Sequence, residues 1–317
     1  MTSLLSGVAL PAIELTPSVM NQQAITSLTS DQTSIAQLEE QLSTGNQVNQ
    51  PSDNPAQTSN IMQLDAALTR ANTYAANASD GLGWLSTANS TMNEVISTLQ
   101  QVRQTVLSIS SASLTNSPAA IQALADQVNS AQQSLLNLAN TSYDGQAIFA
   151  GTGNVTTAFD AAGIYVGGGS APTRTVAPGT QVAISATGDA VFGTGTTGLL
   201  STQPGNLGVL AQLSQDIQTN TKASLANAMG PDLKNLDAAI SNVENQAAQL
   251  GAQYQQLSSL NQQVTASQAA INKELSGIQS VNLPQAITNL QLQQNDYQTA
   301  LWATSQLIQP SLVQFLS

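Results

Sequence analysis

Side chains that could carry out catalysis are few in this sequence and lie far apart. The 317 residues include no cysteine and no histidine, which excludes thiolate nucleophiles, zinc-finger sites and histidine acid–base catalysis. A serine or threonine nucleophile would therefore lack its usual base. Glu39 and Glu40 are adjacent, so on a helix they point to different faces and cannot work as an acid–base pair. The sequence thus predicts no enzyme, no cofactor and no metal site.

Anion-binding sites are equally poorly supported. Gly167-Gly168-Gly169 could begin a phosphate-binding loop, but no Gly-Lys-Ser/Thr follows it and no helix is expected to start there. The six basic residues are far apart in a chain of net charge −12. No basic patch is therefore available for a nucleic-acid backbone or an anionic membrane surface. We expect no nucleic-acid partner.

Membrane insertion is not expected either. No stretch approaches the roughly 20 apolar residues that a membrane span needs. The apolar start of the chain lacks a basic region and its apolar run stops at Pro11, so we do not expect a cleaved signal peptide.

The composition favours thin helical bundles over one large globular core. Only 8% of the residues are charged and 3% are aromatic, and aromatic side chains usually supply much of the buried area in a large core. Helices rich in Gln and Ala suit a thin bundle, whose seam needs only a narrow apolar stripe. The alternative is a disordered Gln/Asn-rich chain. Regular apolar periodicity along most of the sequence opposes that alternative.

Apolar residues recur at intervals of three and four, which predicts long helices. The first helix runs from Met20 to Leu42, the second begins at Pro55, and the third begins after Ser117-Pro118. Residues 240–278 keep the most regular heptad register and would form a helix roughly 58 Å long. A last amphipathic helix follows a break at Pro284. Helical halves with such narrow stripes can bury them only against each other or against neighbouring molecules.

Individual residues of these helices carry more specific expectations. Gly81 and Gly83 weaken the second helix and predict a bend or break near Trp84. Leu250 and Leu257 occupy seam positions of the long helix. We expect both leucines to pack against the second or third helix.

The character of the sequence changes at Asn140. Twelve of the 21 glycines lie between Gly151 and Gly205. Short alternating runs at 173–177 and 181–185 predict strands with glycine and proline between them. The sequence therefore predicts a small β-rich insertion, whose core anchors would be Phe159, Tyr165 and Phe192.

The stretch between the first two helices carries turn and capping signals. Gly45 suits a left-handed position after the first helix. Asn54 and Pro55 fit the N-cap and first position of the second helix, and Gln57 could supply half of a capping box. Local chemistry alone indicates an ordinary surface connection. The sharper hypothesis is that another molecule packs on this loop.

The same stretch resembles a known family. Leu42-Ser-Thr-Gly45 followed by Gln50-Pro-Ser-Asp-Asn-Pro55 resembles the LSTG…PSDDP signature of the flagellin superfamily, with Asn54 in place of the second Asp. Similar motifs follow at Trp84-Leu85-Ser86, at Ile148-Phe149-Ala150-Gly151 and along 286–301. Within the superfamily, these motifs are most similar to those of the hook-associated proteins at the hook–filament junction.

The resemblance and the periodicity together imply a mainly α fold. We expect a long antiparallel, coiled-coil-like helical bundle built from both termini, with a small β-rich domain inserted mid-chain. The predicted domains are an N-terminal extension at 1–15, an N-terminal axial helix and loop at 16–50, the two halves of a helical domain at 51–150 and 206–282, the β-rich insertion at 151–205, and a C-terminal axial helix at 283–317.

The resemblance also implies a function. It indicates a structural component of the bacterial flagellum, an extracellular adaptor at the hook–filament junction that assembles through its paired terminal helices. Implied partners are further copies of the chain, the preceding hook-associated junction protein, flagellin and a type III export chaperone. Export would occur through the flagellar type III apparatus, with the chain unfolded and uncleaved. The main alternative is flagellin itself, the filament subunit, and a coiled-coil surface adhesin is less favoured.

The predicted assembly interface lies on the terminal helices and the first connector. Helices at 16–42 and 283–317 have few charge pairs and are marginal without a partner. We expect them to be disordered or loosely docked in the free subunit and to become ordered on assembly. The interface residues expected from the sequence are Leu38, Leu42, Ser43, Gly45, Pro51, Asp53, Leu290, Leu301, Leu307, Leu312 and Leu316.

Overall fold

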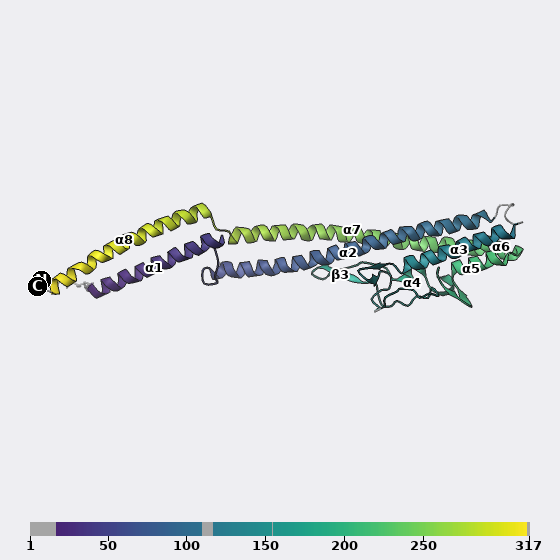
Figure 1. Ribbon diagram of the computed structural model, residues 1–317, viewed down its shortest axis with the longest axis horizontal. Coiled ribbons are helices and arrows are strands. Elements are labelled where there is room, and N and C mark those ends of the chain that lie inside the picture. Colours follow the sequence, from purple (N-terminus) through teal and green to yellow (C-terminus); the bar gives the residue numbers. More distant parts are fainter. Residues whose placement is uncertain (1–16, 110–116, 154, 316–317) are drawn as a thin grey trace, which may run out of the picture. The chain divides into compact units, whose positions relative to one another are not determined.

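The computed structural model describes residues 17–109, 117–153 and 155–315, and it is mainly helical (Figure 1). The predicted N-terminal extension at 1–15 lies outside these residues. Within them, no helix combines the length and apolar character that a membrane span requires. The elements in chain order are α1 (Pro17–Thr44), α2 (Pro55–Ser108), α3 (Pro118–Ala139), β1 (Ser142–Tyr143), β2 (Gln146–Ala147), β3 (Thr173–Ala177), β4 (Thr180–Ala183), α4 (Gly188–Phe192), the 3-10 helix η1 (Gly195–Thr197), β5 (Thr202–Gln203), β6 (Asn206–Leu207), α5 (Val209–Thr219), α6 (Lys222–Asn227), the π-helix η2 (Ala228–Asp232), α7 (Leu233–Gln279) and α8 (Leu283–Phe315).

The chain divides into two compact units. Unit 1 comprises Met1–Ala67 and Ala270–Ser317, and unit 2 comprises Leu68–Ala269. Unit 1 therefore contains both terminal helices, whereas unit 2 contains the central helices and every strand. The fold class expected from the sequence, long helices contributed by both ends of the chain with a small inserted domain, is confirmed.

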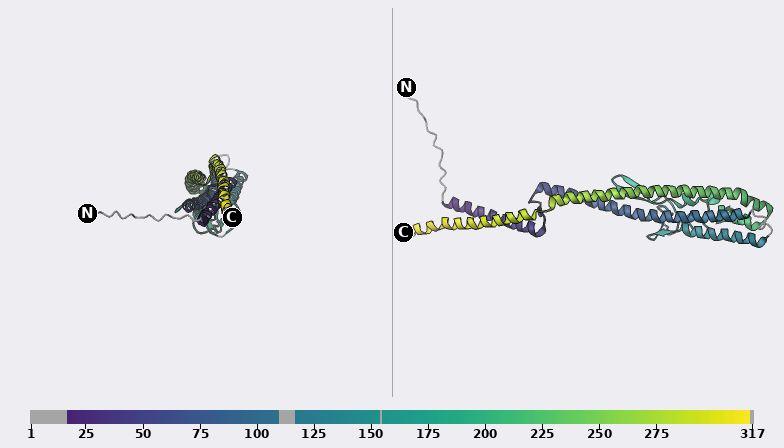
Figure 2. Two further views of the ribbon diagram at one scale, coloured as in Figure 1. Left: turned by 90° about the vertical axis from the view of Figure 1, so that its left-hand side faces the viewer. Right: turned by 90° about the horizontal axis from the view of Figure 1, so that it is seen from above.

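The core of unit 2 is a helical seam between segments far apart in the sequence. Within this unit α2 and α7 lie side by side (Figures 1 and 2). Two polar contacts join them: Gln268 Nε2 donates to Asn72 Oδ1 at 2.8 Å, and Arg103 Nε donates to Asp237 Oδ1 at 2.7 Å. Buried apolar side chains fill the seam between them, among them Leu85, Met92, Leu99 and Val106 of α2 and Leu236, Val243, Leu250 and Leu257 of α7.

The glycines of α2 allow close packing without interrupting the helix. α2 continues through Gly81 and Gly83, so the break expected there does not occur. A Cβ atom on Gly81 would lie 2.8 Å from Leu257 Cδ2, and one on Gly83 would overlap the ring of Tyr143. Each glycine costs helix stability of about 1 kcal/mol relative to alanine. That cost is offset by contacts that a larger residue would prevent.

The inserted region consists of loops and three separate two-stranded antiparallel ladders, β1–β2, β3–β4 and β5–β6. Its centre is a cluster of aromatic rings. Phe159 lies edge-on to Phe192 with ring centroids 5.4 Å apart, and 5.3 Å from the ring of Tyr165. The prediction that these three residues anchor the insertion is confirmed. Phe149, just after β2, adds a fourth ring.

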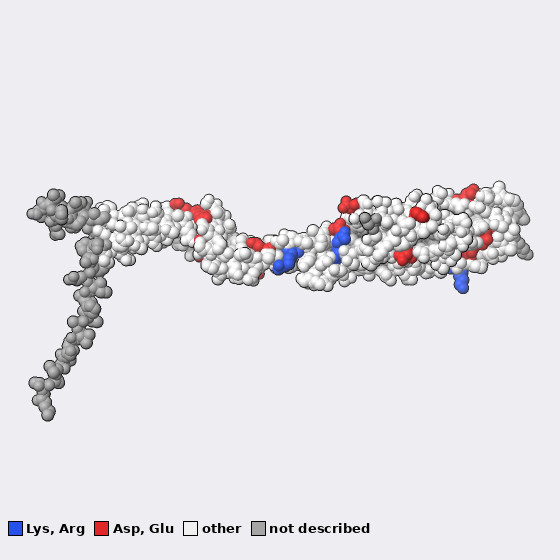
Figure 3. Space-filling view, turned by 90° about the horizontal axis from the view of Figure 1, so that it is seen from below, with Lys and Arg blue, Asp and Glu red and all other residues white. Residues whose placement is uncertain are grey.

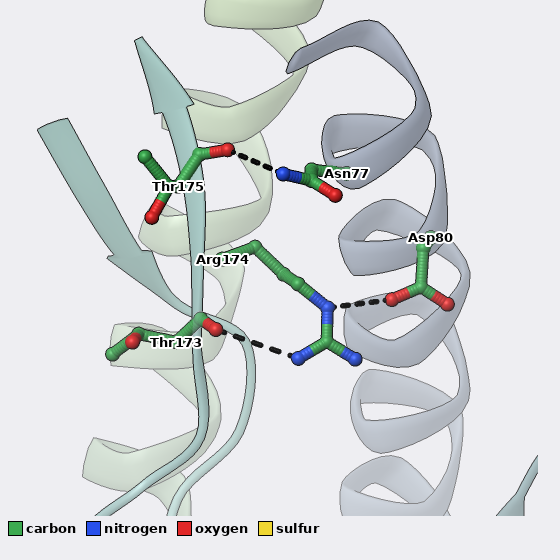
Figure 4. A network of polar contacts seen from close by, with 5 residues as sticks. All are labelled: Asn77, Asp80, Thr173, Arg174 and Thr175. Atoms are coloured by element: carbon green, nitrogen blue, oxygen red, sulfur yellow. Dashed lines mark hydrogen bonds and ion pairs between the residues drawn. The ribbon is translucent and has the colours of Figure 1, made fainter. Parts of the chain in front are cut away.

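One polar network fastens the β3–β4 hairpin to α2 (Figure 4). Arg174 Nε donates to Asp80 Oδ2 at 2.7 Å, and its guanidinium lies over the ring of Trp84 at 5.9 Å from the centroid. Asn77 Nδ2 donates to the carbonyl of Thr175 at 2.9 Å. The ion pair is partly exposed and therefore adds only about 0–1 kcal/mol. Its main effect is to fix where the hairpin lies on the helix.

The seam of unit 2 gives a first prediction. Leu257→Ala or Leu250→Ala should lower the free energy of unfolding by about 2–5 kcal/mol, because each removes a fully buried side chain. Urea or thermal denaturation measures the loss. Leu107→Ala is the control, since Leu107 is an exposed leucine of α2, and it should change stability by only about 0.5 kcal/mol. Unchanged unfolding in both buried variants would contradict the described seam.

Candidate assembly interface

The terminal helices pair with each other in unit 1. α1 and α8 lie antiparallel and side by side (Figures 1 and 2). Partly buried positions recur at threes and fours on both helices, the spacing of a two-helix seam. Those of α1 include Ala24, Leu28, Asp31, Ile35, Leu38 and Leu42. Those of α8 include Leu290, Gln293, Tyr297, Ala300 and Thr304, which continue the row that begins at the buried Ala286.

This seam is much less buried than the seam of unit 2. Among the described side chains of α1, none is fully buried, and Ala286 is the one buried residue among those of α8. A polar contact crosses the seam, where Gln293 Nε2 donates to Asp31 Oδ1 at 2.9 Å. A polar pair in an apolar seam favours one register over alternatives. The pair of helices is therefore aligned but only weakly stabilised by its own contacts.

The two connectors of unit 1 also hold each other. Asn46 and Ser280 form an isolated antiparallel bridge. The amide of Gln47 donates to the carbonyl of Gln279 at 2.6 Å, and the amide of Val281 donates to the carbonyl of Gly45 at 3.0 Å. Gly45 has a φ of +73°, which confirms the left-handed position expected there and which glycine adopts without strain. The turn between α1 and α2 is thereby tied to the turn between α7 and α8.

Asp53 and Asn54 have separate tasks in the first connector. Asp53 Oδ2 accepts hydrogen bonds from the amides of Asn49 at 3.0 Å and Gln50 at 2.9 Å, which closes the loop. Asn54 Oδ1 accepts from the amide of Gln57 at 3.1 Å, so the predicted N-cap of α2 is confirmed. The loop-closing role of Asp53 was not foreseen, because its partners are backbone amides that no side-chain spacing reveals.

Large apolar side chains of α8 remain exposed outside the seam. Ile287 and Leu301 are 47% and 43% exposed and lie two heptads apart, so they share one side of the helix. Trp302, next to Leu301, is 72% exposed. On α1, Met20 and Ile25 are exposed as well. Exposed apolar side chains in such number indicate a surface that binds another protein. Sequence reasoning missed Trp302 because it lies off the heptad positions.

The predicted interface residues fall into distinct places. Leu38, Leu42 and Leu290 contribute to the α1–α8 seam, whereas Leu301 is exposed beside it. Ser43, in the last turn of α1, and Pro51, in the first connector, are exposed, whereas Gly45 and Asp53 of that connector are partly buried. The side chains of Leu307 and Leu312, and all of Leu316, lie outside what the structure describes. Assignment of these residues to an assembly interface stays a prediction.

Charge is sparse on these helices. α1 carries Asp31, Glu39 and Glu40, α8 carries Asp296, and neither helix contains Lys or Arg. The space-filling view shows the same scarcity, with isolated charged side chains on a largely uncharged surface (Figure 3). Contacts made by α1 and α8 must therefore depend on apolar and amide side chains rather than on ion pairs.

The connector gives a second prediction. Asp53→Ala should speed amide hydrogen exchange at Asn49 and Gln50 by roughly fivefold, because each amide loses an acceptor worth about 1 kcal/mol. Asp53→Asn retains a side-chain oxygen and should show a smaller effect. The amide of Gln57, bonded to Asn54, is an internal control whose exchange should not change. If the amides of Asn49 and Gln50 exchange at wild-type rates in Asp53→Ala, Asp53 does not close the loop.

The sequence matches the two helical regions of bacterial flagellins and is similar to known flagellar proteins. Residues 17–154 match the family described as bacterial flagellin N-terminal helical region, and residues 233–316 match the bacterial flagellin C-terminal helical region. The chain is 25% identical over 310 residues to flagellar hook-associated protein 3 of Escherichia coli, and this match covers 93% of this chain and 97% of that protein. Flagellin A of Vibrio anguillarum is 34% identical, but the match covers 36% of this chain and 30% of that flagellin.

Solved structures show the same fold. A putative flagellar hook-associated protein from Vibrio parahaemolyticus superimposes with a TM-score of 0.62 at 18% identity, over 72% of this chain and all of that one. The flagellar junction protein FlgL from Legionella pneumophila superimposes with a TM-score of 0.53 at 15% identity, over 69% of this chain and all of that one. The two flagellin regions together span most of the sequence. The chain therefore belongs to the flagellin superfamily, and its match over nearly the full length is to flagellar hook-associated protein 3.

Proposed function

We propose that the chain is a structural component of the bacterial flagellum, an adaptor at the hook–filament junction that assembles through its paired terminal helices. The observation that carries this proposal is the apolar surface that the α1–α8 pair leaves uncovered. In a flagellin-superfamily chain, that surface is suited to packing against neighbouring subunits. The full-length match to hook-associated protein 3 favours the junction over the filament.

The energetics of the α1–α8 pair support assembly through these helices. Helices with so little buried surface are marginal in water on their own. Ile287 and Leu301 are already about half-covered, so burying the rest of each would contribute on the order of 1 kcal/mol. Trp302 has more surface to bury. Repeated around a ring of subunits, such contacts stabilise an assembly that a single pair of helices cannot.

The proposal includes a location and a set of partners. The partners are further copies of the chain, the preceding hook-associated junction protein and flagellin, with a type III export chaperone before assembly. The chain would be exported unfolded and act outside the cell, and it would not be an enzyme. Loosely held terminal helices are compatible with passage through a narrow export channel.

Flagellin is the second candidate, because Flagellin A of Vibrio anguillarum matches part of the chain at higher identity. Gel electrophoresis of purified flagella separates the two. A filament subunit would be the dominant band, whereas a junction protein would be a minor band. A dominant band would overturn the junction proposal.

The exposed surface of α8 gives a third prediction. The double variant Ile287→Gln, Leu301→Gln should fold with the melting temperature of the wild-type chain, because neither residue is in the seam with α1. In a strain that lacks the wild-type chain, it should reach the culture medium but leave most hooks without filaments. Electron microscopy counts the filaments, and an immunoblot of the medium verifies export.

The matched control places the same changes on unit 2. Leu107→Gln, Val166→Gln also replaces two exposed apolar residues, and it should leave filament number unchanged. A normal number of filaments in the Ile287→Gln, Leu301→Gln strain would show that assembly does not use this side of α8.

A further inference from the structure

Two aspartate side chains meet where the π-helical turn before α7 packs against α5. Asp232 is the last residue of that turn, η2, which also contains Pro231. Its side chain is within hydrogen-bonding reach of Asp216 on α5. The residue is only 6% exposed, and its Oδ2 atom is buried without a hydrogen-bond partner. An ionised carboxylate in this position would face another acceptor and no donor.

No basic side chain that the structure describes forms an ion pair with either aspartate. Asp216 accepts a hydrogen bond from Gln212 Nε2 at 3.3 Å, which uses a neutral amide. The other charged groups near the start of α7 and on its neighbours are Asp126 of α3, Lys222 of α6, whose side chain lies outside the description, and, on α7, Lys234 and Asp237, which pairs with Arg103. Glu244, Lys273 and Glu274 lie farther along α7.

A proton resolves this arrangement. If Asp232 is protonated, its hydroxyl can donate to Asp216, and the unpartnered oxygen gains a partner. Two adjacent carboxyls that cannot both ionise titrate as a pair. Burial first, then the hydrogen bond to Asp216 and the negative charge of Asp216, together raise the pKa of Asp232 to about 7. Asp232 also lines a pocket of about 840 Å³ open to solvent, which allows proton exchange.

We propose that Asp216 and Asp232 share one proton in the folded subunit, and that loss of this proton loosens the joint between α5 and the start of α7. In the unfolded chain Asp232 titrates near 3.8, and in the folded chain near 7. Between these values the folded state holds a proton that the unfolded state has released. The contribution of this pair to stability is therefore full below about pH 4, falls as pH rises toward 7, and is lost above it.

The test is the pH dependence of melting of the full chain. Asp232→Asn keeps the shape of the side chain, removes the charge, and provides an N–H that can donate to Asp216. It should raise the melting temperature of unit 2 by several degrees at pH 8, and this gain should shrink as the pH is lowered to 5. Asp126→Asn is the control, because Asp126 is an exposed carboxylate of α3, and it should give no such pH-dependent gain.

A second measurement reads the proton directly. In an NMR titration of the chain labelled with ¹³C at the aspartate carboxyls, the signal that is missing from Asp232→Asn identifies Asp232. The pH midpoint of this signal's shift should lie near 7. In Asp216→Asn the midpoint should fall toward the ordinary value. A wild-type midpoint near 4, or a loss of stability in Asp232→Asn that is equal at pH 5 and pH 8, would overturn the proposal. Stabilisation by Ca²⁺ at pH 8 that disappears in Asp232→Asn would also overturn it, since the pair would then be a cation site.

Discussion

The contact between α2 and α7 is the interaction on which unit 2 depends. Each helix has only a narrow apolar stripe, and a helix of this kind gains most of its stability from packing rather than from its own propensity. The stripe of α2 meets that of α7 closely enough that Gly81 has no room for a Cβ atom beside Leu257. Neither helix is therefore stable until residues more than a hundred positions apart in the sequence pack against each other.

Unit 1 uses the same seam geometry with a different outcome. α1 and α8 have heptad spacing, but their seam is only partly buried and includes the Asp31–Gln293 contact. Apolar residues that would complete a larger core, such as Ile287 and Trp302, remain exposed outside the seam. This difference in burial supports the proposal that other subunits complete the packing of unit 1.

Local chemistry predicted much of the fold. The periodicity located the long helices, and Gly45 and Asn54 could be assigned because a left-handed turn and an N-cap depend on neighbouring backbone alone. The continuity of α2 at Gly81 could not be predicted, since the packing of Leu257 and Ile184 around this glycine is not visible in the local sequence. For the candidate site, the periodicity identified Leu38, Leu42 and Leu290. It could not find Trp302, which lies off the heptad, or the meeting of Asp216 with Asp232.

Polar contacts between elements specify position more than they add stability. The Arg103–Asp237 and Arg174–Asp80 pairs are partly exposed, so each contributes little to the free energy of folding. They nevertheless penalise any shift of α7 or of the β3–β4 hairpin along α2, because a shift would leave both partners unpaired. Apolar seams with regular spacing tolerate slippage by whole heptads. In a chain with so few charges, single polar pairs at long sequence separation therefore favour one of the similar registers, by up to about 1 kcal/mol each.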